Sequence, residues 1–477
     1  MKFLCRFRGL SRSLLLLVLA APLARGEAAK DFSVGPARPT PAWIRDAVVY
    51  EIFPRQFSAA GNFAGITAKL DELKALGVDV LWLMPVQRIG RLHRKGGLGS
   101  YYSIADYRAI NPEFGSAADF AALVNDAHRQ GMKVILDWVP NHTSFDHAWI
   151  TQHPTWYLHK ADGSVSNAVD ESGKETDWTD VAQLNYDNAE MRRAMIADMR
   201  WWLDVMKVDG FRCDFAAGVP MDFWVDARRQ LTAARPDVFL LAEAESPALG
   251  EAFDMSYGWE LHHLLNDLAQ GTKSTTELDA YFQRQQRAYR AKDIRLYFTS
   301  NHDENSWNGT EFERMGVNHL PAFILAATTR GSMPLLYTGQ ERSFNRRLRF
   351  FEKDTVDWTG PSLESFYRSV FDLKHAEAAL RNGAAGGTQT TLRTDGGSRV
   401  YAFTRSRDGS EVVVAVNFGD TSATLAYQGL PQPGEYTDWF SKTAVTLARA
   451  GKLDVPSHGY RVLVRKSRAT RLPERAH

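Results

Sequence analysis

The chain has 477 residues, and its 57 lysines and arginines nearly balance 56 aspartates and glutamates, giving a formal net charge of +1 at pH 7. This balance excludes a strongly basic nucleic-acid groove or a polybasic membrane-binding patch and favours a neutral substrate. The length is sufficient for a large α/β barrel with an additional domain.

The N-terminus has the features of an export signal. A basic segment precedes the short apolar run Leu14–Ala21 and a stretch of small residues, so residues 1–28 are predicted to be a signal peptide. The apolar run is well below the ~20 residues that a membrane span needs, so we expect no stable membrane anchor after cleavage. The mature protein is predicted to be secreted or periplasmic and monomeric, with a linker at residues 29–42. It would retain only Cys213 and therefore no internal disulfide.

Short apolar segments then alternate with amphipathic segments such as Ala117–Arg129 and Glu190–Met206. The apolar segments are typical of strands that are buried on both faces of a parallel sheet. They are Val48–Phe53, Val80–Met84, Lys133–Asp137, Val208–Asp214, Val238–Ala242, Phe253–Tyr257, Ile294–Ser300 and Met333–Tyr337. Eight strands interleaved with helices predict an α/β fold, a (β/α)8 TIM barrel, at residues 43–141 and 187–384.

Two regions depart from this repeat. Residues 142–186 are long, polar and rich in turn-forming residues, and we predict a small inserted domain after the third strand, above the carboxyl ends of the strands. Residues 385–467 alternate apolar and polar residues at strand period between Gly and Asp turns, which predicts a C-terminal antiparallel β-sandwich domain. A charged tail follows at residues 468–477.

Three acidic residues stand at or just past the ends of three of the predicted strands. Asp214, Glu243 and Asp303 lie in the segments VDGFRCDF, VFLLAEAE and LYFTSNHDEN. Because parallel strands of a barrel end at one common face, we expect these carboxylates to meet in one pocket. A pair of carboxylates at such a face is what the cleavage of a glycosidic bond needs, one as nucleophile and one as proton donor.

Roles for two of these acids follow from their surroundings. Arg212 and Asp214 are two residues apart on a strand and face the same way. A buried arginine lowers the pKa of a neighbouring carboxyl and keeps it ionised, as a nucleophile requires, although the same pair could be purely structural. Glu243 ends an apolar strand, and an acid in partly apolar surroundings retains its proton, as a general acid requires.

Further polar residues stand at the same expected face. His302 precedes Asp303, and the third strand ends in Asp137 and is followed by Asn141 and His142. These side chains could hydrogen-bond a sugar beside the scissile bond, and the residues alone also allow them to be metal ligands.

The joint set of segments resembles the α-amylase family of glycoside hydrolases. DWVPNH, GFRCDFA, LLAEAE and FTSNHDEN look like its four signature segments, and YEIFPRQF, YYSIADYRAINPEFG and GSMPLLYTGQE extend the resemblance over nearly the whole mature chain. The resemblance implies a nucleophile at Asp214, an acid/base at Glu243 and a hydroxyl-binding, ring-distorting carboxylate at Asp303. It further implies substrate contacts or supporting roles at Tyr102, Asp137, His142, Arg212 and His302.

The reaction implied by the resemblance is hydrolysis of α-1,4-glucosidic bonds in starch, glycogen or maltooligosaccharides with net retention of configuration. The two carboxyls should then lie roughly 5–5.5 Å apart. No cofactor is required for this chemistry. Many members hold a structural Ca²⁺ between an asparagine that matches Asn141 and an aspartate of the inserted domain, but Gln183 stands at the aspartate's position, so the calcium site is in doubt.

Other functions share parts of this pattern. A glucanotransferase or a trehalose-forming transglycosylase of the same fold would use the same acids with a different acceptor. An inactive glucan-binding relative would usually lack one of the acids, and a metal-dependent barrel hydrolase would often begin with a pair of histidines at the first strand, where this chain has YEIF.

Overall fold

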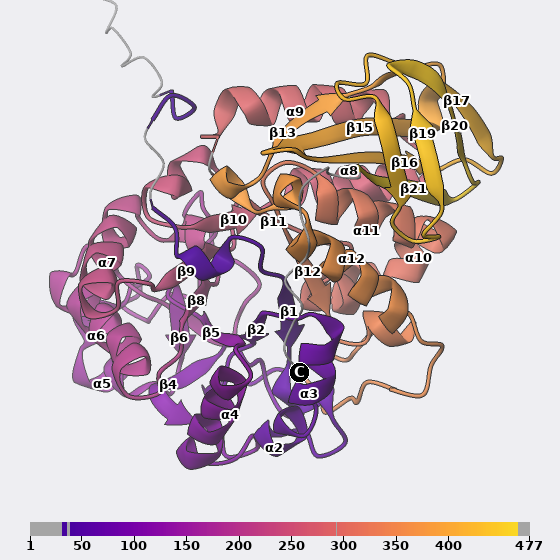
Figure 1. The fold of residues 1–477 in the computed structure, drawn as a ribbon. Helices are drawn as coiled ribbons and strands as arrows, with labels where there is room; N and C mark the ends of the chain where they lie inside the picture. The colour runs from indigo at the N-terminus through magenta and orange to yellow at the C-terminus, as the bar shows by residue number, and fades with distance from the viewer. Residues whose placement is uncertain (1–30, 36–38, 292, 466–477) are drawn as a thin grey trace, which may run out of the picture. The chain divides into compact units, whose positions relative to one another are not determined.

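The computed structural model describes residues 31–35, 39–291 and 293–465. Eight parallel strands form a closed barrel in the order β1-β12-β11-β10-β9-β8-β5-β2 (Figure 1). These strands are β1 (Val49–Ile52), β2 (Val80–Leu83), β5 (Lys133–Trp138), β8 (Gly210–Cys213), β9 (Phe239–Ala242), β10 (Met255–Tyr257), β11 (Ile294–Tyr297) and β12 (Ser332–Tyr337). Each lies within or overlaps one of the eight predicted segments, so the predicted barrel is confirmed. The predicted signal peptide and tail lie outside the described residues.

Both faces of the barrel strands are buried, which explains their nearly continuous apolar sequence. In β2, Val80 and Trp82 belong to the core inside the barrel. The alternate residues Leu81 and Leu83 belong to the core between the barrel and its helices. A period of two places each set on its own face of the sheet.

Helices surround the barrel and fill most of the sequence between its strands (Figure 1). Two of the longer ones begin at polar caps: Ser116 and Asp119 form a reciprocal capping box at α4, and the Asn188 side chain caps α6. The helices are α1 (Pro54–Phe57), α2 (Phe63–Thr67), α3 (Leu70–Leu76), α4 (Ala117–Arg129), α5 (Ala148–Gln152), α6 (Ala189–Asp204), α7 (Met221–Ala234), α8 (Trp259–Gln270), α9 (Thr276–Ala288), α10 (Glu311–Met315), α11 (His319–Thr328) and α12 (Glu364–Ala376).

The strand register brings the acids together. Cys213 of β8 is paired with Ala242 of β9, so the next residues, Asp214 and Glu243, leave adjacent strands at the same level. The Glu243 amide also donates to the Cys213 carbonyl at 3.0 Å. Arg212 is likewise paired with Asp137 of β5, so four of the predicted site residues lie on, or directly after, three neighbouring strands.

The inserted region carries little regular structure. Its short strands β6 (His142–Ser144) and β7 (Val181–Gln183) are antiparallel, and α5 lies between them in sequence. A second antiparallel pair, β3 (Gln87–Ile89) and β4 (Ile104–Ile110), follows β2 and encloses the loop from residue 90 to 103. Both excursions leave the carboxyl ends of barrel strands.

The C-terminal region forms two antiparallel sheets, in the orders β13-β15-β16-β21-β18-β19 and β14-β17-β20. Residues of both sheets, among them Val413 and Leu453, share one apolar core, so the predicted sandwich is confirmed. Its strands are β13 (Thr388–Thr391), β14 (Arg393–Thr394), β15 (Val400–Arg407), β16 (Ser410–Asn417), β17 (Ala423–Gln428), β18 (Gly434–Asp438), β19 (Ala444–Leu447), β20 (Ala450–Val455) and β21 (Gly459–Arg465). Within the described residues, no helix has the length and apolar character to cross a bilayer.

Candidate active site

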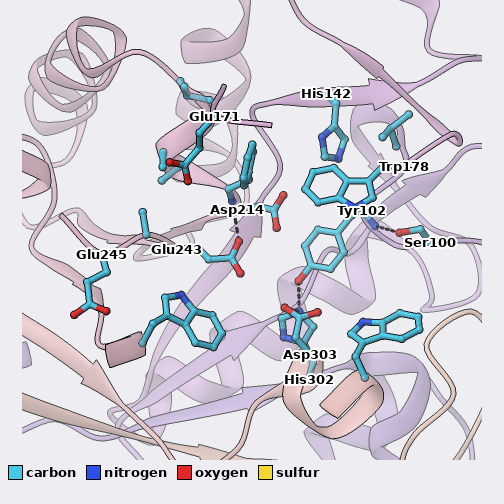
Figure 2. Close-up of a pocket in the computed structure, with 18 of the residues that line it drawn as sticks. Ser100, Tyr102, His142, Glu171, Trp178, Asp214, Glu243, Glu245, His302 and Asp303 are labelled. Carbon is cyan, nitrogen blue, oxygen red and sulfur yellow. Dashed lines mark hydrogen bonds and ion pairs between the residues drawn. The ribbon is translucent and has the colours of Figure 1, made fainter. Parts of the chain in front are cut away.

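A cleft of about 1000 Å³ opens at the carboxyl ends of the barrel strands. Asp214, Glu243 and Asp303 all line it, together with Tyr102 and His302. Figure 2 shows Glu243 on one side of Asp214 and Tyr102, His302 and Asp303 on the other. The three acids predicted to converge therefore share one pocket.

Arg212 is the centre of an ion-pair network in the floor of this cleft. Its Nη1 donates to Asp137 Oδ1 at 3.0 Å and to Asp214 Oδ1 at 2.9 Å, and its Nη2 lies 2.5 Å from Glu243 Oε1. Arg212 and Asp137 are fully buried, whereas the side chains of Asp214 and Glu243 are 13% and 16% exposed. One guanidinium thus holds two carboxyls side by side at the cleft surface, the arrangement that a nucleophile and a proton donor need.

The second oxygen of Glu243 is held by a strained turn. The Phe215 amide donates to Glu243 Oε2 at 2.8 Å. Phe215 has φ +43° and ψ +47°, a left-handed conformation that costs a non-glycine residue about 1–3 kcal/mol. Its ring packs edge-on against Trp178 at 5.4 Å, which helps to hold the turn in place. No pattern in the sequence indicated this contact.

The pKa of Asp214 differs from the sequence-based expectation. Burial and the nearby charge of Glu243 raise the pKa of Asp214 well above its ordinary value, and the opposing effect of Arg212 is smaller. Burial also raises the pKa of Asp137 to about 6. The expectation that Arg212 would lower the pKa of Asp214 below its ordinary value is therefore wrong. Asp137, Asp214 and Glu243 surround the single cation of Arg212, so their mutual repulsion favours a protonated form of one of them. A site that uses one carboxyl as an acid and another as a nucleophile requires such a proton.

A second hydrogen-bonded chain lies on the other side of Asp214. Tyr102 Oη lies 3.1 Å from Asp137 Oδ2 and 2.9 Å from His302 Nε2, and the same His302 nitrogen lies 3.2 Å from Asp303 Oδ2. His302 Nδ1 lies 2.5 Å from the fully buried carboxylate of Glu51. Burial lowers the pKa of His302, but Asp303 and Glu51 outweigh it and raise this pKa well above the ordinary value. His302 is thus an imidazolium near neutral pH.

His142 is buried at the start of the inserted region, on the same side of Asp214 as Tyr102 (Figure 2). Its ring packs edge-on against Trp178 at 5.8 Å. Burial lowers the pKa of His142 to about 4, so the imidazole is neutral near pH 7 and can both donate and accept hydrogen bonds. It lines the same cleft as the three acids, as the sequence predicted.

The position expected for calcium is filled by an amide pair. The Gln183 Nε2 donates to Asn141 Oδ1 and to the Asn141 carbonyl, each at 3.0 Å, and the Asn141 amide donates to Gln183 Oε1 at 3.3 Å. A Ca²⁺ ion takes six to eight oxygen ligands and favours carboxylates. Here the candidate ligand, Asn141 Oδ1, already accepts a hydrogen bond, and the side chain that faces it, Gln183, carries an amide in place of a carboxylate. The residues present do not fit the expected calcium site.

Two further residues of the site were not predicted: Glu51, which is fully buried against His302, and Trp307, which lines the cleft. Glu51 could have been noticed, because it is an isolated acid inside an otherwise apolar strand. Trp307 lies in a π-helical turn, Glu304–Asn308, and such turns are frequent at functional sites. Its side chain forms a hydrogen bond with Asp303, and this turn cannot be read from sequence.

Comparison with known families agrees with this geometry. A model described as the alpha amylase catalytic domain matches residues 51–369, and one described as the alpha amylase C-terminal all-beta domain matches residues 392–466. The chain belongs to the alpha-amylase family. Of the residues that the resemblance implied, six line the cleft, namely Tyr102, His142, Asp214, Glu243, His302 and Asp303. Asp137 and Arg212 are buried beneath it.

Several family members are similar over most of the chain. The alpha-amylase MalA of Haloarcula japonica is 30% identical over 84% of this chain and 59% of its own length, so this chain spans less than two thirds of that relative. A solved alpha-amylase from Lactobacillus plantarum superposes with a TM-score of 0.79 at 32% identity, covering 89% of this chain and all of that one. A maltogenic alpha-amylase from Thermotoga neapolitana superposes with a TM-score of 0.80 at 26% identity over 88% of this chain and 99% of its own.

Proposed function

We propose that this family member hydrolyses α-1,4-glucosidic bonds of starch, glycogen or maltooligosaccharides by a retaining double displacement. The observation that carries the proposal is the shared contact of Asp214 and Glu243 with one buried guanidinium at the surface of the cleft. The choice of substrate is supported by relatives that are named alpha-amylases, such as those of Haloarcula japonica and Lactobacillus plantarum.

The two carboxyls divide the reaction. Glu243 donates its proton to the glycosidic oxygen while a carboxylate oxygen of Asp214 attacks the anomeric carbon, so that the leaving chain departs as an alcohol and a glycosyl ester forms on Asp214. Glu243, now ionised, removes a proton from an incoming water, which attacks the same carbon and breaks the ester. Two inversions give net retention. The Phe215 amide contact keeps Glu243 in place for both proton transfers.

The residues beyond Asp214 hold the sugar that is cleaved. Asp303 and the His302 imidazolium can bind its hydroxyls, Tyr102 offers an aromatic face, and the neutral His142 can also hydrogen-bond it. Asp137 does not face the cleft openly; its full burial against Arg212 makes it a positioning residue.

Stereochemistry and product analysis test this proposal. ¹H NMR during the first turnovers of maltoheptaose should show the α-anomer as the first new product, and chromatography should show only chains shorter than the substrate. Initial release of the β-anomer would overturn the retaining mechanism. Chains longer than the substrate would favour the glucanotransferase alternative. A relative from Mycolicibacterium smegmatis is named trehalose synthase/amylase, which is the reason to test for transfer.

We also propose that the protein is exported and acts outside the cytoplasm as a monomer. The basic segment and the apolar run Leu14–Ala21 support cleavage after residue 28. N-terminal sequencing of protein recovered from the periplasm or medium should begin near residue 29. Recovery of the full-length chain in the cytoplasm alone would contradict export.

We propose that folding and activity do not depend on calcium, because Asn141 and Gln183 satisfy each other. A strong chelator is expected to leave both the melting temperature and kcat unchanged. Gln183→Asp removes the two hydrogen bonds that the Gln183 amide donates to Asn141, and this should lower the unfolding free energy by about 1–3 kcal/mol. A chelator-induced fall in the melting temperature of the wild type would contradict this prediction.

The dependence of kcat/KM on pH should reflect the raised pKa of Asp214. Because burial and Glu243 raise the pKa of Asp214, the ionised nucleophile is lost while the pH is still above the ordinary range of an aspartate, and kcat/KM should fall there on the acid side. Asp137 also raises this pKa, so Asp137→Asn is expected to move the acid limb to lower pH by roughly one unit. Asp198→Asn, at a half-buried pair with Arg108 away from the cleft, is the control. An unchanged or upward-shifted limb in Asp137→Asn would contradict the account.

A further inference from the structure

The proposed mechanism gives the cleft a direction. The acid/base must face the glycosidic oxygen and the leaving chain, so the rim beyond Glu243 binds the aglycon. The rim on the other side of Asp214, with Tyr102 and Asp303, binds the glycon, the part of the chain toward its non-reducing end (Figure 2). The inference below rests on this proposed function and concerns the glycon rim.

The loop that follows β3 is tied across the glycon rim to the loop that follows β12. The Gly97 amide donates to Glu352 Oε1 at 2.6 Å, and the Leu98 amide donates to the Phe351 carbonyl at 3.1 Å. A Cβ added at Gly96 would lie only 2.4 Å from the Phe351 Cβ, so the two loops touch there. The buried Arg55 donates to the Gly99 carbonyl at 3.3 Å and holds the first loop from below.

The same loop is tied to the inserted region. Lys95 Nζ donates to the Asp177 carbonyl at 2.7 Å and lies 3.6 Å from the Asp180 carboxylate. Ser103 Oγ fixes that segment from the other side by donating to the Asp180 carbonyl at 2.9 Å. The inserted region, the loop after β3 and the loop after β12 therefore form one connected band.

Aromatic rings complete the band next to the sugar-binding residues. Phe350 stacks on Tyr102 at 6.3 Å with an interplanar angle of 20°, and Trp307 lies 5.1 Å from Phe350. The Trp307 side chain is 53% exposed and lines the cleft. We call Lys95, Gly97, Trp307, Phe350, Phe351 and Glu352 the glycon wall; all but Gly97 and Glu352 line the cleft itself.

The aglycon rim has a different character. Beyond Asp214 and Glu243 the lining includes the short side chains of Ala216, Ala217 and Ala244, beside the larger Met221, Leu249 and Trp259. Ala217 is exposed, and the described contacts include no tie across this rim comparable to Lys95 with Asp180. A long leaving chain can extend in this direction, whereas a long glycon meets the wall.

We propose that the glycon wall makes this enzyme act from the non-reducing end of α-glucan chains, with room for one or two sugars between the scissile bond and the wall. Tyr102 lies under the sugar at the cleavage position, and the exposed face of Trp307 supports one further sugar directly beyond it. The enzyme then releases glucose or maltose and cleaves internal bonds of long chains poorly. Steric exclusion of a longer glycon, rather than an added attraction, sets the specificity.

A pair of substrates that differ only at the chain end tests the proposal. 4-Nitrophenyl α-maltoheptaoside is compared with the same compound carrying a 4,6-O-ethylidene group on its non-reducing sugar, with products followed by chromatography and mass spectrometry. The free substrate should release glucose or maltose first, and the blocked one should react at least about tenfold more slowly. Equal rates, or first products with three or more glycon sugars, would overturn the wall. Inactivity on both would overturn the proposed function and this inference with it.

Removing the contacts that hold the glycon wall together should change the ratio between the rates on the blocked and the free substrate. Glu352→Ala removes the acceptor for the Gly97 amide, and Lys95→Ala removes the tie to the inserted region. Each is expected to raise the rate on the blocked substrate relative to the free one by several-fold. Lys273→Ala, which removes an exposed pair with Asp267 away from the cleft, is the matched control and should leave the ratio unchanged. An unchanged ratio in both wall variants, with melting temperatures equal to that of the wild type, would overturn the assignment of these residues.

Discussion

Replacing Asp214 with asparagine is expected to reduce kcat on maltooligosaccharides by roughly four to six orders of magnitude, because the covalent step loses its nucleophile. The amide keeps the volume of the side chain and an oxygen that can accept from Arg212 Nη1, which lies 2.9 Å from Asp214 Oδ1. It also removes a carboxyl whose burial is unfavourable, as its raised pKa shows, so the melting temperature should not fall. The measurement is single-turnover and steady-state kinetics on maltoheptaose beside a thermal unfolding curve.

Glu243→Gln separates the two carboxyl roles. On a natural glucan it should lose about two to four orders of magnitude, because the leaving alcohol receives no proton. On an α-glycosyl fluoride, whose leaving group needs no proton, the first step should proceed at close to the wild-type rate. Asp214→Asn should be inactive on both substrates. Substantial turnover of the fluoride by Asp214→Asn would show that the nucleophile lies elsewhere.

Replacing Arg212 with methionine is expected to cost about 3–5 kcal/mol of unfolding free energy at neutral pH, because it leaves buried carboxylates without their cation. Asp137 is fully buried and its pKa is already raised to about 6 in the folded state, above that of an unfolded aspartate. A carboxyl with a raised folded pKa disfavours folding as the pH rises. Without Arg212 this pKa rises further, so the stability loss should be smaller at about pH 5 than at neutral pH. Urea unfolding at the two pH values checks the sign.

The activity of the same variant should fall by about two to three orders of magnitude even under conditions where it is folded, because Asp214 and Glu243 lose their common anchor. Arg228→Met is the matched control. Arg228 is also buried and paired with an aspartate, Asp254, but outside the cleft. It should lose stability to a similar degree while kcat stays near the wild-type value. Equal kinetic losses in the two variants would show that Arg212 acts only through the fold.

The barrel could be predicted from sequence because its strands are buried on both faces. Segments such as Val80–Met84 are therefore apolar throughout, and polar residues such as Asp214 and Glu243 stand out where each strand ends. The register then follows from the fold: adjacent parallel strands that start in phase place Asp214 beside Glu243. The candidate acids thus needed only the order of strands and their ends.

Other parts of the site depend on distances that no sequence pattern encodes. The direction of the Asp214 pKa shift depends on how closely Glu243 and Asp137 crowd one cation, and the sign expected from Arg212 alone was wrong. The left-handed turn at Phe215 uses a residue type that rarely adopts it. The glycon wall joins loops more than two hundred residues apart, for example Gly97 and Glu352, through a backbone amide, which carries no side-chain signature.

The central claim is that Asp214 forms a glycosyl ester with the substrate, and trapping that ester tests it most directly. A 5-fluoro α-glycosyl fluoride reacts at the nucleophile, and its ring fluorine slows hydrolysis of the ester that forms. Peptide mapping by mass spectrometry should place the added sugar on Asp214, within the segment GFRCDFA. A sugar attached to any other residue, or none attached while the fluoride is consumed with inversion, would contradict the account.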